Sequence, residues 1–408
     1  MNVLWIIEGN KKSANYKIAF ELAKNMKQKH TLSCAVYSGN EYEQCQELRT
    51  VFDNVSFIGS VDSKKLSDLY ADKRWGAKTN NQKLKYAIKH PQIAVELLRK
   101  EIFKGTKRSI RQLKKICTDE KIDVIIGVVF PYKIVNIMSE VQVNAKKLII
   151  QLDPYVNNYT LNPKKITKRI AEEQRLLNSI QCIFTTGIIK NEMLNNHKIE
   201  NNKIVEIEFP EMSVEKMDDE KEHKALISKN EDSIFVLYAG SLYKDIRNPV
   251  HLVRLFEQLP ENYLLVVAGF NSGLLKEYDE KIRNRVIDLG YIDQTDVECL
   301  KKDADVLVCF NNAIENQVPS KLFECIETGK PFINLCQLVN CPSLPYVQEY
   351  DNVINVFIND MKPDEIIHFI ETHKNKVIAR DEILKKYYKH TYEYVVNQIE
   401  EVVTSVNI

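Results

Sequence analysis

A serine and a glutamate lie one helical turn apart in the segment Gln317–Pro331. Ser320 is a favourable N-cap, because its hydroxyl can accept from a free backbone N–H, and Gly329 followed by Pro331 marks a helix end. Residues four positions apart share a helix face, so Glu324 lies one turn inside the helix. A helix start favours a phosphate, and a carboxylate accepts from two vicinal hydroxyls. The segment therefore predicts half of a nucleotide site.

The other half of such a site is predicted about eighty residues earlier in the chain. A buried apolar strand runs into Gly240 and Ser241, and Asn248 stands where it can cap a second helix. A glycine at a strand end lets a ligand approach the backbone closely. Lys244 and Arg247 add two cations, which suit a diphosphate. For the Gly-Ser loop alone, ordinary turn chemistry is the alternative interpretation.

In this order, the motifs resemble the donor-binding domain of retaining nucleotide-sugar glycosyltransferases of family 4, which have the GT-B architecture. The resemblance implies that Gly240, Ser241 and Arg247 meet the donor diphosphate. It also implies that backbone near Tyr291 and Ile292 reads the base and that Glu324 holds the ribose. It covers roughly residues 233–340, and the further motifs that carry it are Leu264–Gly269, Asp288–Ile292, Ala304–Val308 and Pro319–Glu324.

One position departs from the family pattern, which often pairs two glutamates eight positions apart. The position eight before Glu324 is Asn316, and Glu315 is one residue out of register. An amide can both donate to and accept from sugar hydroxyls. We therefore expect Asn316, with Ser320 and Lys244, to complete the donor site.

The expected chemistry is transfer of the sugar away from a diphosphate leaving group. The protein must then stabilise developing phosphate charge, and Arg247, Lys321 and Lys244 are the candidate cations. No cofactor or metal is expected. Asp303-Ala-Asp305 has the spacing of a metal-phosphate bridge, but it leads into a buried strand.

Polar residues also follow strands of the first half, where the carboxyl ends of parallel strands line a binding crevice. Gly9, Ser13 and Asn15 follow the first strand and are the candidate acceptor-side residues. Asp153 follows a later buried strand and is a candidate for orienting acceptor or donor hydroxyls. A turn aspartate before Pro154 is the alternative interpretation.

The composition is that of a folded protein, with 408 residues, 44% hydrophobic and 28% charged. The nine cysteines are scattered singly, which predicts buried reduced thiols rather than zinc sites or disulfides. The sequence shows no signal-peptide pattern and no apolar run long enough for a membrane span. These features predict a cytoplasmic protein.

Strand-like apolar runs alternate with helical stretches along both halves of the chain. Continuous apolar runs predict strands covered on both faces, and two such series predict two doubly wound α/β domains. The expected fold is GT-B: an acceptor-binding domain 1–208, a donor-binding domain 209–384, a central cleft, and a C-terminal helix 385–408 crossing back to the first domain. The expected strands are Val3–Ile7, Leu32–Tyr37, Val55–Ile58, Val124–Val129, Leu148–Leu152, Cys182–Thr185, Phe235–Ala239, Leu264–Ala268, Val286–Leu289, Val306–Phe310, Phe332–Leu335 and Val353–Phe357.

Charge is divided unevenly along the chain. Residues 1–185 contain 32 Lys and Arg against 18 Asp and Glu, whereas the remainder contains 25 against 38. Much of the surplus lies near Leu98–Ile116, where basic residues surround an apolar stripe. Two interpretations stay open: a solvated helix face, or a basic amphipathic helix on an anionic membrane. No aromatic platform for stacking bases accompanies it, so nucleic acid is not the expected partner.

The sequence thus predicts a retaining hexosyltransferase. It would use a nucleotide diphosphate-sugar and a glycan or lipid-linked hydroxyl acceptor in surface polysaccharide or glycoconjugate synthesis, peripheral to the inner membrane face. Two alternatives stay open: a non-catalytic GT-B subunit that binds a partner transferase or acceptor, and a nucleotide-sugar epimerase on the same fold.

Overall fold

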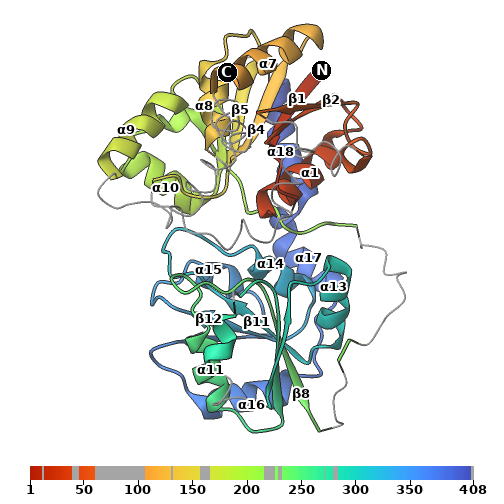
Figure 1. Ribbon diagram of the computed structural model, residues 1–408, viewed down its shortest axis with the longest axis vertical. Coiled ribbons are helices and arrows are strands. Elements are labelled where there is room, and N and C mark those ends of the chain that lie inside the picture. The colour runs from red at the N-terminus through yellow and green to blue at the C-terminus, as the bar shows by residue number, and fades with distance from the viewer. Residues whose placement is uncertain are drawn as a thin grey trace, which may run out of the picture. The chain divides into compact units, whose positions relative to one another are not determined.

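The computed structural model describes residues 1–11, 13–38, 46–59, 106–129, 132–156, 166–215, 226–227, 232–271, 273–278 and 284–405. The chain divides into two compact units, Met1–Pro210 with Tyr392–Ile408, and Glu211–Thr391 (Figure 1). Each unit is built on a parallel sheet flanked by helices, as the continuous apolar runs predicted.

The sheet of the first unit has the order β3-β2-β1-β4-β5-β6-β7. The strand order reverses at β1, which pairs with both β2 and β4, and ligands of doubly wound sheets bind at the carboxyl ends of strands beside such a reversal. Its strands are β1 (Asn2–Glu8), β2 (Thr31–Tyr37), β3 (Asn54–Ile58), β4 (Val124–Val129), β5 (Lys146–Gln151), β6 (Cys182–Thr185) and β7 (Ile204–Glu206).

The described helices of the first unit include the C-terminal one. Helix α18 packs against α1, which confirms that the C-terminus returns to the first unit. The return begins at Tyr392 rather than at 385, because α17 and a short 3-10 turn end first and belong to the second unit. The helices are α1 (Ala14–Met26), α7 (Thr106–Asp119), α8 (Lys133–Glu140), α9 (Ile166–Leu177), α10 (Gly187–Asn195) and α18 (Tyr392–Thr404).

The sheet of the second unit has the order β10-β9-β8-β11-β12-β13, and its strand order reverses at β8. Its strands are β8 (Ile234–Ala239), β9 (Tyr263–Ala268), β10 (Val286–Gly290), β11 (Val306–Phe310), β12 (Phe332–Cys336) and β13 (Val353–Phe357). Its described helices are α11 (Val250–Glu257), α13 (Gln294–Asp303), α14 (Lys321–Glu327), α15 (Leu344–Val347), α16 (Pro363–His373) and α17 (Arg380–Tyr387).

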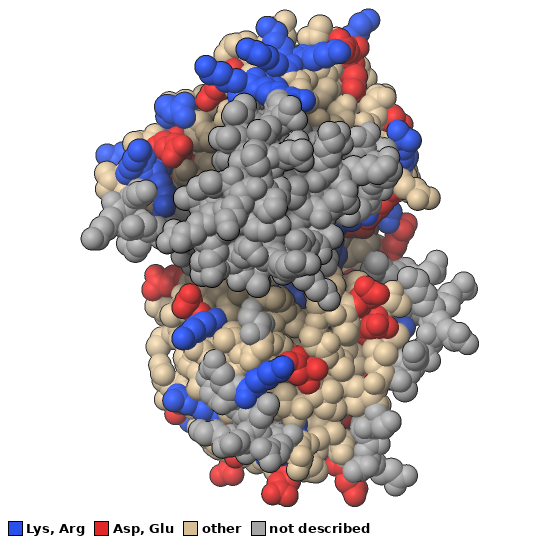
Figure 2. All heavy atoms as spheres, viewed as in Figure 1, with Lys and Arg blue, Asp and Glu red and all other residues tan. Residues whose placement is uncertain are grey.

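Helix α7 contains the described part of the basic segment, and residues 98–105 of that segment lie outside the described residues. Ser109, Leu113 and Cys117 on α7 are buried against the unit. The basic side chains therefore lie on the outward side, and Figure 2 shows Lys and Arg gathered at this end of the unit. No described helix is long and apolar enough to cross a membrane, and the eight cysteines within the described ranges are buried and free.

Candidate functional site

Gly240 follows β8 and Gly269 follows the neighbouring strand β9, and the backbone at these two strand ends is closely packed. The Gly240 N–H donates to the Ala268 carbonyl at 2.9 Å. A Cβ on Gly269 would lie 2.2 Å from the Gly240 oxygen, and a Cβ on Gly240 would lie 2.8 Å from the Tyr238 hydroxyl. That hydroxyl donates to the Ser241 carbonyl at 3.0 Å. The backbone of Gly240 and Ser241 is therefore close-packed and fixed at the carboxyl end of β8.

The residues after Ser241 form a tight turn that carries Arg247. Backbone hydrogen bonds of 3.1 and 3.0 Å join Tyr243 and Arg247, and the guanidinium lies 5.6 Å from the centre of the Tyr243 ring. The Arg247 Nε is buried without a hydrogen-bond partner among the described residues, so its N–H can donate to a ligand oxygen. Asn248 accepts from the Val250 N–H at 3.0 Å, as expected of a helix-start residue, and Lys244 is exposed.

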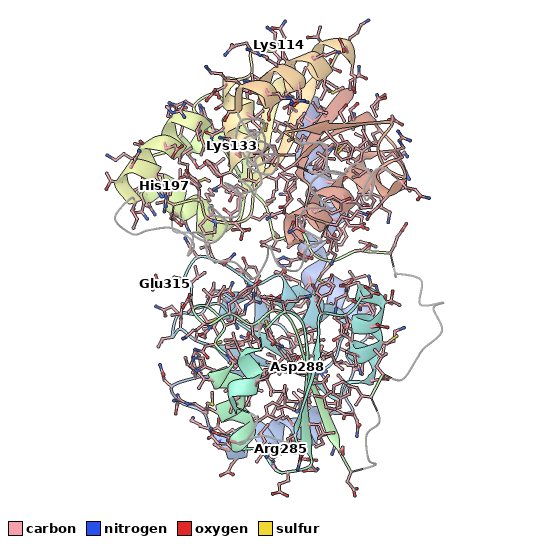
Figure 3. All side chains as sticks on the ribbon, in the orientation of Figure 1. Lys114, Lys133, His197, Arg285, Asp288 and Glu315 are labelled. Atoms are coloured by element: carbon pink, nitrogen blue, oxygen red, sulfur yellow. The ribbon has the colours of Figure 1, made fainter. Side chains whose placement is uncertain are left out.

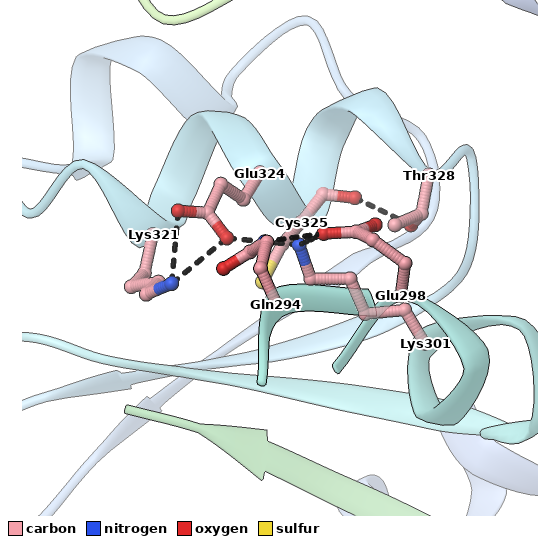
Figure 4. A network of polar contacts seen from close by, with 7 residues as sticks. All are labelled: Gln294, Glu298, Lys301, Lys321, Glu324, Cys325 and Thr328. Carbon is pink, nitrogen blue, oxygen red and sulfur yellow. Dashed lines mark hydrogen bonds and ion pairs between the residues drawn. The ribbon is translucent and has the colours of Figure 1, made fainter. Parts of the chain in front are cut away.

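Helix α14 places Glu324 between two lysines (Figure 4). The Lys321 ammonium donates to both carboxylate oxygens of Glu324 at 2.9 Å, and Lys301 on α13 donates to Oε2 at 2.8 Å. Glu324 is therefore an ionised, paired carboxylate one turn into the helix. The sequence indicated Lys321 as a cation of the donor site, but it gave no reason to expect Lys301 beside Glu324.

Lys301 is held by more than Glu324. Its ammonium also donates to Glu298 at 3.0 Å, and Gln294 donates to the same Glu298 oxygen at 2.6 Å. Burial opposes the charge on Lys301, but the carboxylates of Glu324 and Glu298 outweigh burial and raise the pKa of the ammonium. Lys301 is therefore a charged group fixed between two helices.

The prediction that the Ser320 side chain caps this helix is wrong. Ser320 itself has helical backbone angles, φ −55° and ψ −31°, and its side chain makes no capping hydrogen bond. The Leu322 N–H instead donates to the Pro319 carbonyl at 3.0 Å, and the Phe323 N–H to the Ser320 carbonyl at 3.1 Å. These 3-10 bonds satisfy first-turn N–H groups that the hydroxyl was expected to bind.

The remaining predicted donor residues lie in loops of the second unit. Tyr291 follows β10 and is 60% exposed, and Ile292 is half-buried. Asn316 is half-buried in the loop before α14, whereas Glu315 is exposed (Figure 3). Asp305 accepts from the Phe235 N–H at 2.7 Å at the amino ends of β11 and β8, and so has a structural role.

In the first unit, the predicted acceptor-side residues lie close together. The Asn15 amide donates to Asp153 at 3.3 Å. Ser13 is the N-cap of α1, accepting from the Tyr16 N–H at 3.1 Å, and its hydroxyl donates to Glu8 at the end of β1. The Gly9 N–H donates to a β2 carbonyl, at Tyr37, at 2.8 Å.

Glu8 is a candidate site residue that the sequence analysis missed. Burial raises its pKa, the hydrogen bond from Ser13 opposes the shift, and the Asp153 charge adds to it, so that the pKa is about 7. The signal in the sequence was an acidic residue ending an otherwise apolar strand. The cluster of Glu8, Ser13, Asn15 and Asp153 offers carboxyl, hydroxyl and amide groups, which are the groups that bind sugar hydroxyls.

A second buried polar network supports the same sheet edge. Glu173 on α9 accepts from Gln151, the last residue of β5, at 3.2 Å and from the Tyr132 hydroxyl at 3.3 Å. It also pairs with His197 (labelled in Figure 3), and the other ring nitrogen of His197 lies 3.5 Å from Glu192. Burial by itself lowers the pKa of His197, but the hydrogen bonds that its ring donates to Glu173 and Glu192 outweigh burial and raise the pKa to about 9.

Comparison with known proteins shows similarity of part of the chain to one family model and of the fold to several solved structures. The family model described as glycosyl transferases group 1 matches residues 219–335. The fold of the whole chain is similar to Anabaena Alr3699/HepE, solved in complex with UDP and glucose, with 11% identity, full coverage of both chains and a TM-score of 0.65. It is also similar to sucrose-phosphate synthase from Thermosynechococcus elongatus, with 12% identity, 98% coverage of both chains and a TM-score of 0.64. The lipopolysaccharide outer core galactosyltransferase WaaB gives 12% identity, 99% coverage of both chains and a TM-score of 0.58. No curated protein matches the sequence.

Proposed function

Because the glycosyl transferases group 1 model matches residues 219–335 in a chain with the GT-B fold, we propose that this enzyme transfers a hexose from a uridine diphosphate-sugar to a hydroxyl acceptor with retention. The observation that carries the proposal is the position of Glu324. It is an ionised carboxylate one turn into α14, on the same unit as the Gly240 loop and Arg247. UDP is the first nucleotide to test, since the similar HepE structure contains it.

In this proposal the ribose hydroxyls donate to Glu324, and Arg247, Lys321 and Lys244 stabilise the charge that develops on the departing diphosphate. The buried Nε of Arg247 supports this role, because donating to a phosphate oxygen would satisfy it. The backbone near Tyr291 and Ile292 reads the base, and Asn316 binds donor-sugar hydroxyls. No metal is required by this arrangement of cations.

On the acceptor side, we assign hydroxyl binding to Asp153 and Asn15, with Glu8, Ser13 and Gly9 around them. The hydrogen bond between Asn15 and Asp153 supports this assignment over a plain turn aspartate, because it orients the carboxylate. The acceptor we propose is a glycan or a lipid-linked sugar of a surface polysaccharide or glycoconjugate.

The test is nucleotide binding followed by turnover. Glu324→Ala should weaken UDP binding by about 2–4 kcal/mol in calorimetry, since it removes hydrogen bonds to a charged group. The variant should stay folded, because the Lys301 ammonium keeps its bond to Glu298 when Glu324 is removed. Turnover of the UDP-sugar should persist in chelator, and product NMR should show a retained anomeric configuration. UDP affinity unchanged by Glu324→Ala would remove the ribose assignment.

A further inference from the structure

The two lysines that hold Glu324 differ in how firmly they are fixed. Lys301 is 10% exposed in its side chain and is shared between Glu298 on its own helix and Glu324 on α14 (Figure 4). Lys321 is 32% exposed and stands three positions before Glu324 on the same helix. Ion pairs between residues of one helix are weak when one partner reaches the solvent, so Lys321 is the partner that a ligand can displace.

A donor ribose must compete with these lysines for the same carboxylate. Lys321 contacts both Glu324 oxygens, whereas Lys301 contacts Oε2 alone. Displacing Lys321 therefore frees acceptor capacity on both oxygens while Lys301 still neutralises the carboxylate. Without Lys301, displacement of Lys321 would leave a largely buried carboxylate without its fixed counter-ion, which is costly.

We propose that Lys301 is a positioning residue for ribose recognition and that the ribose hydroxyls displace Lys321 from Glu324, releasing its ammonium to the donor diphosphate. This inference rests on the proposed donor site. It links the two ends of the nucleotide, because binding of the ribose supplies the cation that the phosphates need. A nucleoside without phosphates would displace Lys321 from Glu324 without offering its ammonium a new partner.

The first test compares UDP with 2′,3′-dideoxy-UDP, which lacks both ribose hydroxyls. Wild type should prefer UDP by about 10–100-fold, the range expected for hydrogen bonds to a charged group. In Lys301→Met the preference should fall below about 5-fold, because Glu324 stays paired with Lys321. Lys302→Met, on the exposed neighbouring residue, removes the same charge and should keep the wild-type preference.

A general loss of stability at α13 would weaken both ligands equally and leave the preference unchanged, which would overturn the positioning role. The second test uses Lys321→Met, which alters a partly exposed side chain and should leave the fold intact. Uridine affinity should stay equal or rise, since a competitor is removed, while UDP affinity should fall about 10-fold or more. Equal losses for uridine and UDP would refute the displacement. Absence of UDP binding to wild type would refute the proposed function itself.

Discussion

At the scale of single residues, Arg247 is the proposed partner of the donor diphosphate. Its Nε is buried and unpaired among the described residues, and its backbone is held by Tyr243. If its bond to the diphosphate strengthens as the sugar departs, Arg247→Ala should lower kcat by about 100-fold or more while changing donor affinity less. Arg254→Ala, at an exposed position of α11, is the matched control. Equal losses in kcat and donor affinity would mean that Arg247 binds the donor without assisting departure.

Glu8 gives a prediction about stability as a function of pH. Its pKa of about 7 in the folded chain lies above the ordinary 4.5, so the folded state binds a proton that the unfolded state releases. The free energy of unfolding should therefore fall as pH rises from about 4.5 to 7, and level off above that range. Glu8→Gln, a neutral mimic of the acid, should remove this slope and stabilise the chain above pH 7.

Thermal melts between pH 5 and 8 measure the effect of Glu8 on stability. Each kcal/mol of change in the free energy of unfolding shifts Tm by about 2–4 °C for a unit of this size. Glu140→Gln changes an exposed carboxylate on α8 and should leave the wild-type slope in place. If Glu8→Gln shows the same slope as wild type, the titrating group is another one.

Among the elements, α9 and the segment after α10 are joined by a buried ion pair. His197 is 3% exposed and Glu173 is 1% exposed. The raised pKa of His197, about 9, means that its charge stabilises the fold fully below about pH 6.5 and that this contribution is lost as pH rises through 9. His197→Gln should cost about 3–5 kcal/mol at pH 7, because it leaves Glu173 buried without a counter-charge.

Thermal unfolding of the first unit, monitored by near-UV circular dichroism, measures the stability cost of His197→Gln. The cost of His197→Gln should shrink as pH rises from 7 to 10, since wild type loses the same charge there. His368→Gln, on the exposed face of α16, should be neutral throughout. A cost that does not change with pH would show that packing, rather than charge, accounts for the effect.

The elements that could be predicted from sequence were those with long apolar runs. All twelve predicted strands are present, because each is a largely apolar run that pairs within a parallel sheet. Strand β7 was missed, since Ile204–Glu206 is only three residues long and ends on an exposed glutamate. The pairing of Lys301 with Glu324 could not be predicted, because it joins two helices and residues 23 positions apart.

For the whole molecule, the surplus of Lys and Arg in the first part of the sequence includes the exposed basic side chains of α7. The apolar stripe of this helix is not free to enter a bilayer, because Leu113 and Cys117 are buried in the unit. Lys107, Arg108 and Arg111 belong to the outward side. Any attraction to an anionic membrane is therefore electrostatic and does not include insertion of the described helix.

We therefore predict reversible binding to anionic vesicles, which would suit the lipid-linked acceptor that we propose. Each basic residue near an anionic surface contributes about 1 kcal/mol, and salt screens it. Co-sedimentation should be strong at low salt, weaken as salt rises, and drop when Lys107, Arg108 and Arg111 are changed together to Glu. The control reverses three exposed lysines of the second unit, Lys276, Lys385 and Lys389. If neutral and anionic vesicles bind the protein equally poorly at low salt, the basic side of α7 is a solvated surface and the acceptor reaches the enzyme in solution.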